Sequence, residues 1–123
     1  MNKVGVVTIG GKKYFACLST RVLVALEDRN GRTTDEELND IFAKGKIRDL
    51  FWLLAEMLKA GYKYAKKMGE ECPEPPSLED LLDETLVTDY KEMFAQLKNA
   101  VQESSKSDVE LDTGKNALTT QDA

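Results

Sequence analysis

The chain has 123 residues, which is enough for one domain with a short tail. Its 17 Lys and Arg against 22 Asp and Glu give a net charge of −5, and it contains no histidine. Histidine is the most common general base and zinc ligand, so its absence lowers the expectation of an enzyme, although enzymes can work without it. The first ten residues lack the long apolar run of a signal peptide, so we expect a cytoplasmic protein.

The charge is divided unevenly along the chain. Residues 1–69 carry 13 basic and 8 acidic side chains, or +5, whereas residues 70–123 carry 4 and 14, or −10. An acidic C-terminal half argues against nucleic-acid binding by the whole protein. The asymmetry favours two uses: the acidic part folds back on the basic core, or both surfaces steer a partner.

The N-terminal stretch predicts a β-hairpin. Residues 4–9 and 13–18 are short runs rich in β-branched and aromatic residues, and Gly10-Gly11 lies between them. Two glycines suit the positive φ of a tight hairpin turn. Alternation places Tyr14, Ala16 and Leu18 on one side, with Phe15 and Cys17 on the other. An isolated hairpin is marginal in water, so it needs a helix to rest on.

Two short helices are expected next. Ser19 or Thr20 caps a helix that ends at about Asn30-Gly31 and buries Val22, Leu23, Ala25 and Leu26. Thr34 and Glu37 have the spacing of a capping box for the second helix. This helix ends at Gly45, and its inward-facing side chains are Leu38, Ile41 and Phe42.

The central stretch, Ile47 to Tyr64, predicts a long helix that continues to about Met68. Its main apolar stripe has helical spacing and contains Ile47, Leu50, Phe51, Leu54, Leu58, Gly61, Tyr62 and Ala65. A second row contains Leu53, Met57, Ala60 and Tyr64, so other elements must cover the helix from more than one side. Asp49, Glu56 and Lys59 interrupt it, which argues against a membrane span. Trp52 lies on a charged face, either as the edge of the core or as an anchor for a partner.

The C-terminal part predicts two more helices after a proline-rich connector at residues 70–76. Ser77 caps the first, with Leu78, Leu81 and Leu82 turned inward. The second starts at Thr85 or Thr88, ends at Val101 and has the stripe Leu86, Tyr90, Met93, Phe94, Leu97 and Val101. From Glu103 the chain is polar and acidic, which is typical of a disordered or partner-dependent tail.

The sequence therefore predicts an α+β fold that is mainly α: an N-terminal β-hairpin packed on a bundle of four to five helices. Residues 1–102 form the single domain, and residues 103–123 form a flexible polar tail.

No motif predicts a catalytic, cofactor or metal site. The glycines between Gly5 and Gly11 fit a hairpin turn better than a phosphate cradle. The acidic run from Asp80 to Asp89 lacks the spacing of a calcium loop. Cys17 and Cys72 fit no metal or redox pattern and are expected as reduced thiols. A mix of aromatic and basic residues, typical of single-strand nucleic-acid surfaces, occurs at Tyr62, Lys63, Tyr64, Lys66 and Lys67.

The order of these elements resembles the small tail assembly chaperones of long-tailed bacteriophages and prophages. The resemblance covers about residues 4–101 and rests on the Gly-turn strand from Ile9 to Tyr14 and the element from Leu23 to Glu27. It also rests on the Leu- and aromatic-rich segment from Phe51 to Tyr62 and on the stretch from Pro76 to Asp83. These are fold-like patterns rather than invariant signatures, and the acidic tail has no counterpart in them.

The resemblance implies a non-enzymatic chaperone that binds the tape-measure protein, keeps its long hydrophobic helices soluble and helps to recruit tail-tube subunits. It also implies self-association, and in some members a longer form made by frameshifting. Residues that could supply the docking surface are Trp52, Tyr62, Tyr64, Met93 and Phe94. Two other classes stay open: a head–tail completion protein that remains in the virion, and a small regulatory or nucleic-acid-binding protein with an exposed basic face at residues 44–67.

Overall fold

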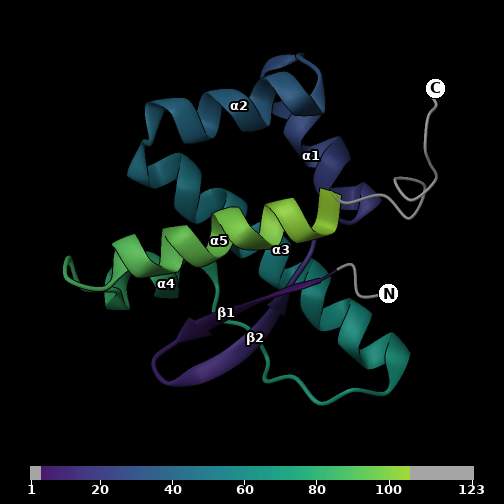
Figure 1. Cartoon of the computed structure of the whole chain (residues 1–123), viewed down its shortest axis with the longest axis vertical. Coiled ribbons are helices and arrows are strands. Elements are labelled where there is room, and N and C mark those ends of the chain that lie inside the picture. The colour runs from purple at the N-terminus through teal and green to yellow at the C-terminus, as the bar shows by residue number, and fades with distance from the viewer. Residues whose placement is uncertain (1–3, 106–123) are drawn as a thin grey trace.

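The computed structural model describes residues 4–105 (Figure 1). Within this range a two-stranded antiparallel hairpin packs against five helices, which confirms the predicted mainly helical α+β fold. In chain order the elements are β1 (Gly5–Ile9), β2 (Lys12–Ala16), α1 (Thr20–Asn30), α2 (Thr34–Lys44), α3 (Ile47–Met68), α4 (Leu78–Glu84) and α5 (Tyr90–Ser105). Among these helices, none has the length and apolar character needed to cross a membrane.

The hairpin has the register that its turn predicts. β1 and β2 pair from Gly5 opposite Ala16 to Ile9 opposite Lys12. The turn glycines have φ angles of 58° and 82°, the positive values that a side chain disfavours. The inward face is buried and includes Val7, Tyr14 and Ala16. The prediction that Tyr14 and Ala16 share one side of the hairpin is therefore confirmed, and that side is the buried one.

The hairpin is held between two helices. β2 packs on α3, and β1 packs on α5, which crosses in front of α3 in Figure 1. The Thr8 N–H donates a hydrogen bond of 2.6 Å to Gln96 Oε1 on α5. The Cys17 N–H, just past β2, donates one of 3.2 Å to the Met57 carbonyl on α3. Backbone groups at the hairpin's edges are thus satisfied by the helices that flank it.

Two glycines permit this close packing. A Cβ on Gly61 of α3 would run into the backbone carbonyl of Phe15 and lie 2.7 Å from the Ala16 nitrogen. A Cβ on Gly5 of β1 would lie 2.6 Å from both Cα and Cβ of Ala100 on α5. A side chain at either glycine would therefore force the hairpin away from a helix.

α3 is the centre of the core, as its apolar stripes predict. Ten of its residues are buried: Leu50, Phe51, Leu53, Leu54, Ala55, Met57, Leu58, Ala60, Gly61 and Ala65. The predicted burial is wrong for two members of the main stripe, Ile47 and Tyr62. Ile47 is 46% exposed because it opens the first turn, where few neighbours cover it. Tyr62 is half-buried and lies beside Lys66, whose amino group is 5.1 Å from the ring centroid. Its phenol reaches the surface instead of the core.

The helix ends follow local chemistry, with one correction. Ser19 caps α1, and Gly31, Gly45 and Gly69 end α1, α2 and α3 with positive φ. The capping box of α2 is formed by Thr33 and Glu36 rather than by Thr34 and Glu37. The prediction was wrong by one residue because Glu37 is turned into the protein, where it binds other partners.

The C-terminal elements differ from the prediction in three places. Leu81 is buried, but Leu82 is exposed. Leu86 lies outside any helix and is exposed, because α5 begins only at Tyr90. α5 continues to Ser105, past the predicted boundary at residue 102, and the Leu18 N–H donates a 3.1 Å hydrogen bond to Ser104 Oγ. The remainder of the predicted tail, residues 106–123, lies outside the described residues.

Candidate binding surfaces

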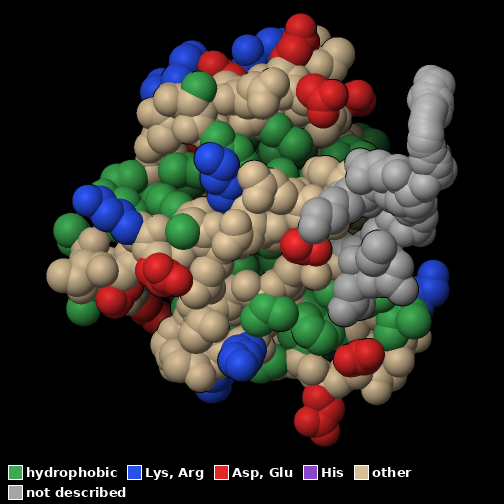
Figure 2. Space-filling view, in the orientation of Figure 1, with side chains coloured by type: hydrophobic (Ala, Val, Ile, Leu, Met, Phe, Trp, Pro, Cys, Tyr) green, Lys and Arg blue, Asp and Glu red, His purple; other side chains and the backbone are tan. Residues whose placement is uncertain are grey.

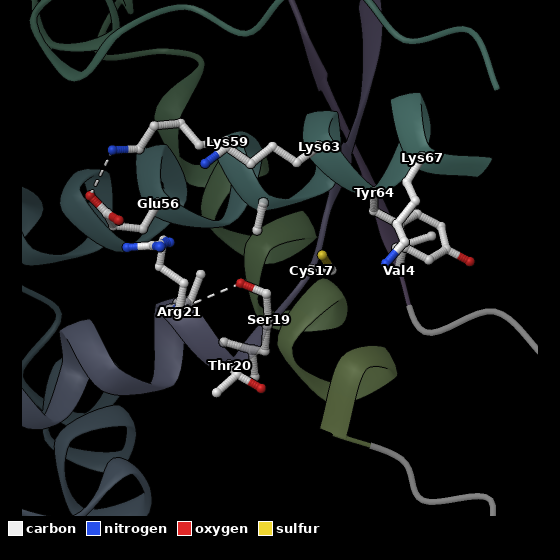
Figure 3. Close-up of a pocket in the computed structure, with 13 residues that line it drawn as sticks. Val4, Cys17, Ser19, Thr20, Arg21, Glu56, Lys59, Lys63, Tyr64 and Lys67 are labelled. Atoms are coloured by element: carbon white, nitrogen blue, oxygen red, sulfur yellow. Dashed lines mark hydrogen bonds and ion pairs between the residues drawn. The ribbon is translucent and has the colours of Figure 1, made fainter. Parts of the chain in front are cut away.

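A groove of about 530 Å³ opens between the start of α1, the end of β2 and the second half of α3 (Figure 3). We call it the basic groove. Its apolar lining comes from Val4, Cys17, Leu18, Val22, Ala60 and Tyr64. Its charged lining comes from Arg21, Glu56, Lys59, Lys63 and Lys67. An apolar floor with a charged rim is the usual arrangement of a peptide- or ligand-binding groove.

The lysines of the groove form a regular row. Lys59, Lys63 and Lys67 recur every four residues on α3, so their Cα atoms rise by about 6 Å per step along the helix. All three are exposed. Glu56 forms an ion pair of 3.1 Å with Lys59, as Figure 3 shows, and Arg21 contributes a further positive charge from α1. The rim thus has four positive groups and one negative group.

Cys17 lies within this groove but is only 7% exposed. Burial raises the pKa of its thiol above the ordinary value of 9.0. The thiol is therefore neutral near pH 7 and is a poor nucleophile. Cys17 and Cys72 are both free thiols, in agreement with the sequence prediction.

A second surface is apolar and protrudes at the connection between α4 and α5. It comprises Leu82, Leu86 and Val87, which are 41%, 65% and 77% exposed, and we call it the apolar ridge. Figure 2 shows hydrophobic side chains at this end of the molecule and in a band between α5 and α2. The other exposed large hydrophobic residues of the described chain, Val6, Val24, Ile47 and Met68, are scattered along the sequence.

An acidic groove of about 470 Å³ lies beside the α4–α5 connection. The hairpin turn forms one wall, and the carboxylate-bearing residues of its lining are Asp80, Glu84, Asp89 and Glu92. No Lys or Arg lines it. The two grooves therefore have opposite charge, and the polarity seen along the sequence is also a polarity of the folded surface.

A buried carboxylate joins α1 and α2. Glu37 is 2% exposed, and its carboxylate accepts hydrogen bonds from Arg32 (2.8 Å) and from Asn30 (2.9 Å). Arg29 lies 3.9 Å from the same carboxylate and donates a 2.7 Å hydrogen bond to Asp49 on α3. These contacts join three helices, and they are structural because every charged group faces another part of the same chain.

The aromatic and methionine residues predicted for partner binding do not form one surface. Trp52 is half-buried, and the Arg29 guanidinium carbon lies 4.4 Å from the centroid of the Trp52 ring. Met93 is buried, and Phe94 packs edge-on against Phe51 with ring centroids 5.0 Å apart.

The two predicted tyrosines lie on different sides of α3. Tyr64 lines the basic groove, whereas Tyr62 faces the proline-rich connector. The apolar ridge was missed, because Leu82 and Leu86 have the spacing of buried helix positions.

The glycines considered as a phosphate cradle have a structural role. Gly10 and Gly11 form the hairpin turn. Among residues 4–105, no cluster of three or more His, Cys, Asp or Glu side chains is arranged to hold a metal ion.

No protein family, curated protein or solved structure was found to match this chain.

Proposed function

We propose that this protein is a non-enzymatic tail assembly chaperone that binds the long apolar helices of a tape-measure protein. The observation that carries the proposal is the apolar ridge, where Leu82, Leu86 and Val87 stand exposed within six residues of chain. Such surface is costly in water and is typical of a protein that binds an apolar partner. The order of a Gly-turn hairpin, two short helices and a long Leu-rich helix supports the same class.

The surroundings of the ridge suit a chaperone. Four carboxylates line the adjoining groove, and no Lys or Arg joins them. A charged border keeps an apolar docking surface soluble while it is unoccupied, and it repels a second copy of the same border. A client helix with an apolar stripe and basic flanks fits this combination.

Co-expression with the tape-measure protein from the same genome tests the proposal. We expect a soluble complex in pull-down and in size-exclusion chromatography with light scattering, while the client alone is insoluble. The Leu86→Ser/Val87→Ser double variant should lose the complex and keep its melting temperature, because both side chains are exposed. Val24→Ser is the matched control, since Val24 is 49% exposed on α1, away from the ridge in sequence.

Three results would count against this function. The client could remain insoluble beside the wild-type protein, or the ridge variant could bind as well as the control. The protein could also be found in purified virions, which would favour a head–tail completion protein.

A nucleic-acid-binding protein is the second candidate. The row of Lys59, Lys63 and Lys67 beside Tyr64 combines phosphate-binding charge with an aromatic ring. If this candidate holds, single-stranded DNA binds with an affinity that falls steeply as salt increases. The variant Lys63→Ala/Lys67→Ala should then reduce both the affinity and its salt dependence.

A further inference from the structure

We propose that the basic groove is the docking site for the chain's own segment Asp108–Asp112, which reads Asp-Val-Glu-Leu-Asp. The segment lies outside the described residues, and it alternates acidic and apolar side chains. The groove offers an apolar floor and a basic rim. This proposal concerns the protein by itself and does not depend on what its client is.

The described chain ends beside the groove. α5 stops at Ser105, and the preceding residue, Ser104, accepts a hydrogen bond of 3.1 Å from the Leu18 N–H. Leu18 is one of the residues that line the groove. The chain beyond Ser105 therefore starts from the wall of the groove, and only residues 106 and 107 separate that point from Asp108.

The reach of the chain is sufficient. An extended chain advances at most about 3.3–3.6 Å per residue, so the seven residues from 106 to 112 can span roughly 23–25 Å. The row from Lys59 to Lys67 covers eight residues of helix, or about 12 Å. The segment is thus long enough to cover the whole row.

Charge and spacing are complementary. The charged lining sums to +3, from four basic groups and Glu56, and the segment carries −3. In an extended chain alternate residues are about 6.6 Å apart, so Asp108, Glu110 and Asp112 repeat at that interval. The rim lysines repeat at about 6 Å along α3. The acidic side chains can therefore each approach a different lysine, in the same order along the groove.

The apolar residues of the segment suit the floor. Val109 and Leu111 alternate with the acids, so an extended segment turns both toward the same side. The floor beneath them includes Cys17, Ala60 and Tyr64. A tethered segment acts at a high effective concentration, so modest contacts are enough to keep it bound. Any other ligand of the groove would have to displace it.

Cys17 provides a native reporter, since it lies in the groove. In a full-length Cys72→Ser background, Cys17 is the single thiol, and its rate of alkylation by N-ethylmaleimide reports access to the groove. An occupied fraction of about nine-tenths slows alkylation about tenfold, because the rate scales with the open fraction. We expect Val109→Ser/Leu111→Ser to remove this protection, and Leu118→Ser, in the same tail, to leave it unchanged. Equal rates in all three proteins would overturn the proposal.

A crosslink separates the possible occupants. In the same background, Leu111→Cys should form an intramolecular disulfide with Cys17 under mild oxidation, whereas Leu118→Cys should not. Disulfide-linked dimers would overturn the proposal and assign the groove to the segment of a second copy. Protection of Cys17 that depends on added single-stranded DNA, with no effect of the Val109→Ser/Leu111→Ser change, would also overturn it and assign the groove to nucleic acid.

Discussion

Gly61 is the position at which one added methyl group should have the largest structural effect. It lies in the middle of α3, where β2 crosses the helix. A Cβ at this position would overlap the Phe15 carbonyl and approach the Ala16 nitrogen to 2.7 Å. Both neighbours are backbone atoms of a paired strand, so neither can rotate away. The hairpin would have to move as a unit, and the hydrogen bond from Cys17 to Met57 would lengthen with it.

The magnitude is the difference between two opposing terms. Replacing Gly with Ala in a helix interior stabilises by about 1 kcal/mol, because the unfolded chain loses freedom. Overpacking a tight contact costs about 1–3 kcal/mol, and a contact with backbone belongs at the upper end. We therefore expect Gly61→Ala to lower the free energy of unfolding by about 2 kcal/mol. For a domain of this size that is a fall in melting temperature of about 8–16 °C.

Urea and thermal unfolding followed by far-ultraviolet circular dichroism measure this change. Ala95→Gly, at an exposed position of α5, is the control that measures the Gly–Ala difference without a packing contact. Gly5→Ala should also destabilise, and Ala100→Gly should relieve part of that effect by removing one of the two clashing carbons. If Gly61→Ala is as stable as the parent protein, the close packing of β2 on α3 is refuted.

Three further predictions follow from the polar and thiol groups. Glu37→Ala should lower the free energy of unfolding by about 3 kcal/mol, as measured by chemical unfolding. This is the lower end of the range for a broken buried ion pair, because the partner Arg32 is partly exposed. A hydrogen bond from Arg32 lowers the pKa of Asp40, so its stabilisation is present above pH 3.8 and is lost as the pH falls through the lowered value. Asp40→Asn should flatten the dependence of melting temperature on pH in that acidic range. In the folded protein, Cys17 should react with Ellman's reagent more slowly than Cys72, because burial raises its thiol pKa.

Each of these predictions has a matched control. Glu27→Ala removes an exposed carboxylate from α1 and should change stability by less than about 0.5 kcal/mol. Asp35→Asn removes an exposed carboxylate at the start of α2. If it flattens the pH dependence of the melting temperature as much as Asp40→Asn does, the effect does not come from Asp40. For the thiols, Cys72→Ser isolates Cys17, and both thiols should react alike in urea. Rapid reaction of Cys17 in the folded protein would contradict its burial.

Local patterns in the sequence were sufficient for the elements and for most of their ends, with the cap of α2 and both ends of α5 as the exceptions. The pair Gly10-Gly11 specifies a turn with positive φ, and Gly31, Gly45 and Gly69 end three helices for the same reason. The apolar spacing of residues 47–68 identified the helix at the centre of the core. These features depend on neighbours in the chain, so periodicity and turn chemistry reveal them.

The tertiary structure decided which side chains are buried and which partners they contact. Glu37 has the spacing of a cap, but it lies in the protein because Arg32 and Asn30 approach it from outside its helix. Leu86 has the spacing of a core residue, but the helix that would bury it starts later, at Tyr90.

The basic groove shows the same division. The sequence showed a basic half and an acidic half, but not that α1, β2 and α3 together enclose an apolar floor beneath three lysines. The physical reason is that helix periodicity sets which residues share a face, whereas burial depends on what packs against that face. Those partners come from distant parts of the chain, and only the fold brings them together.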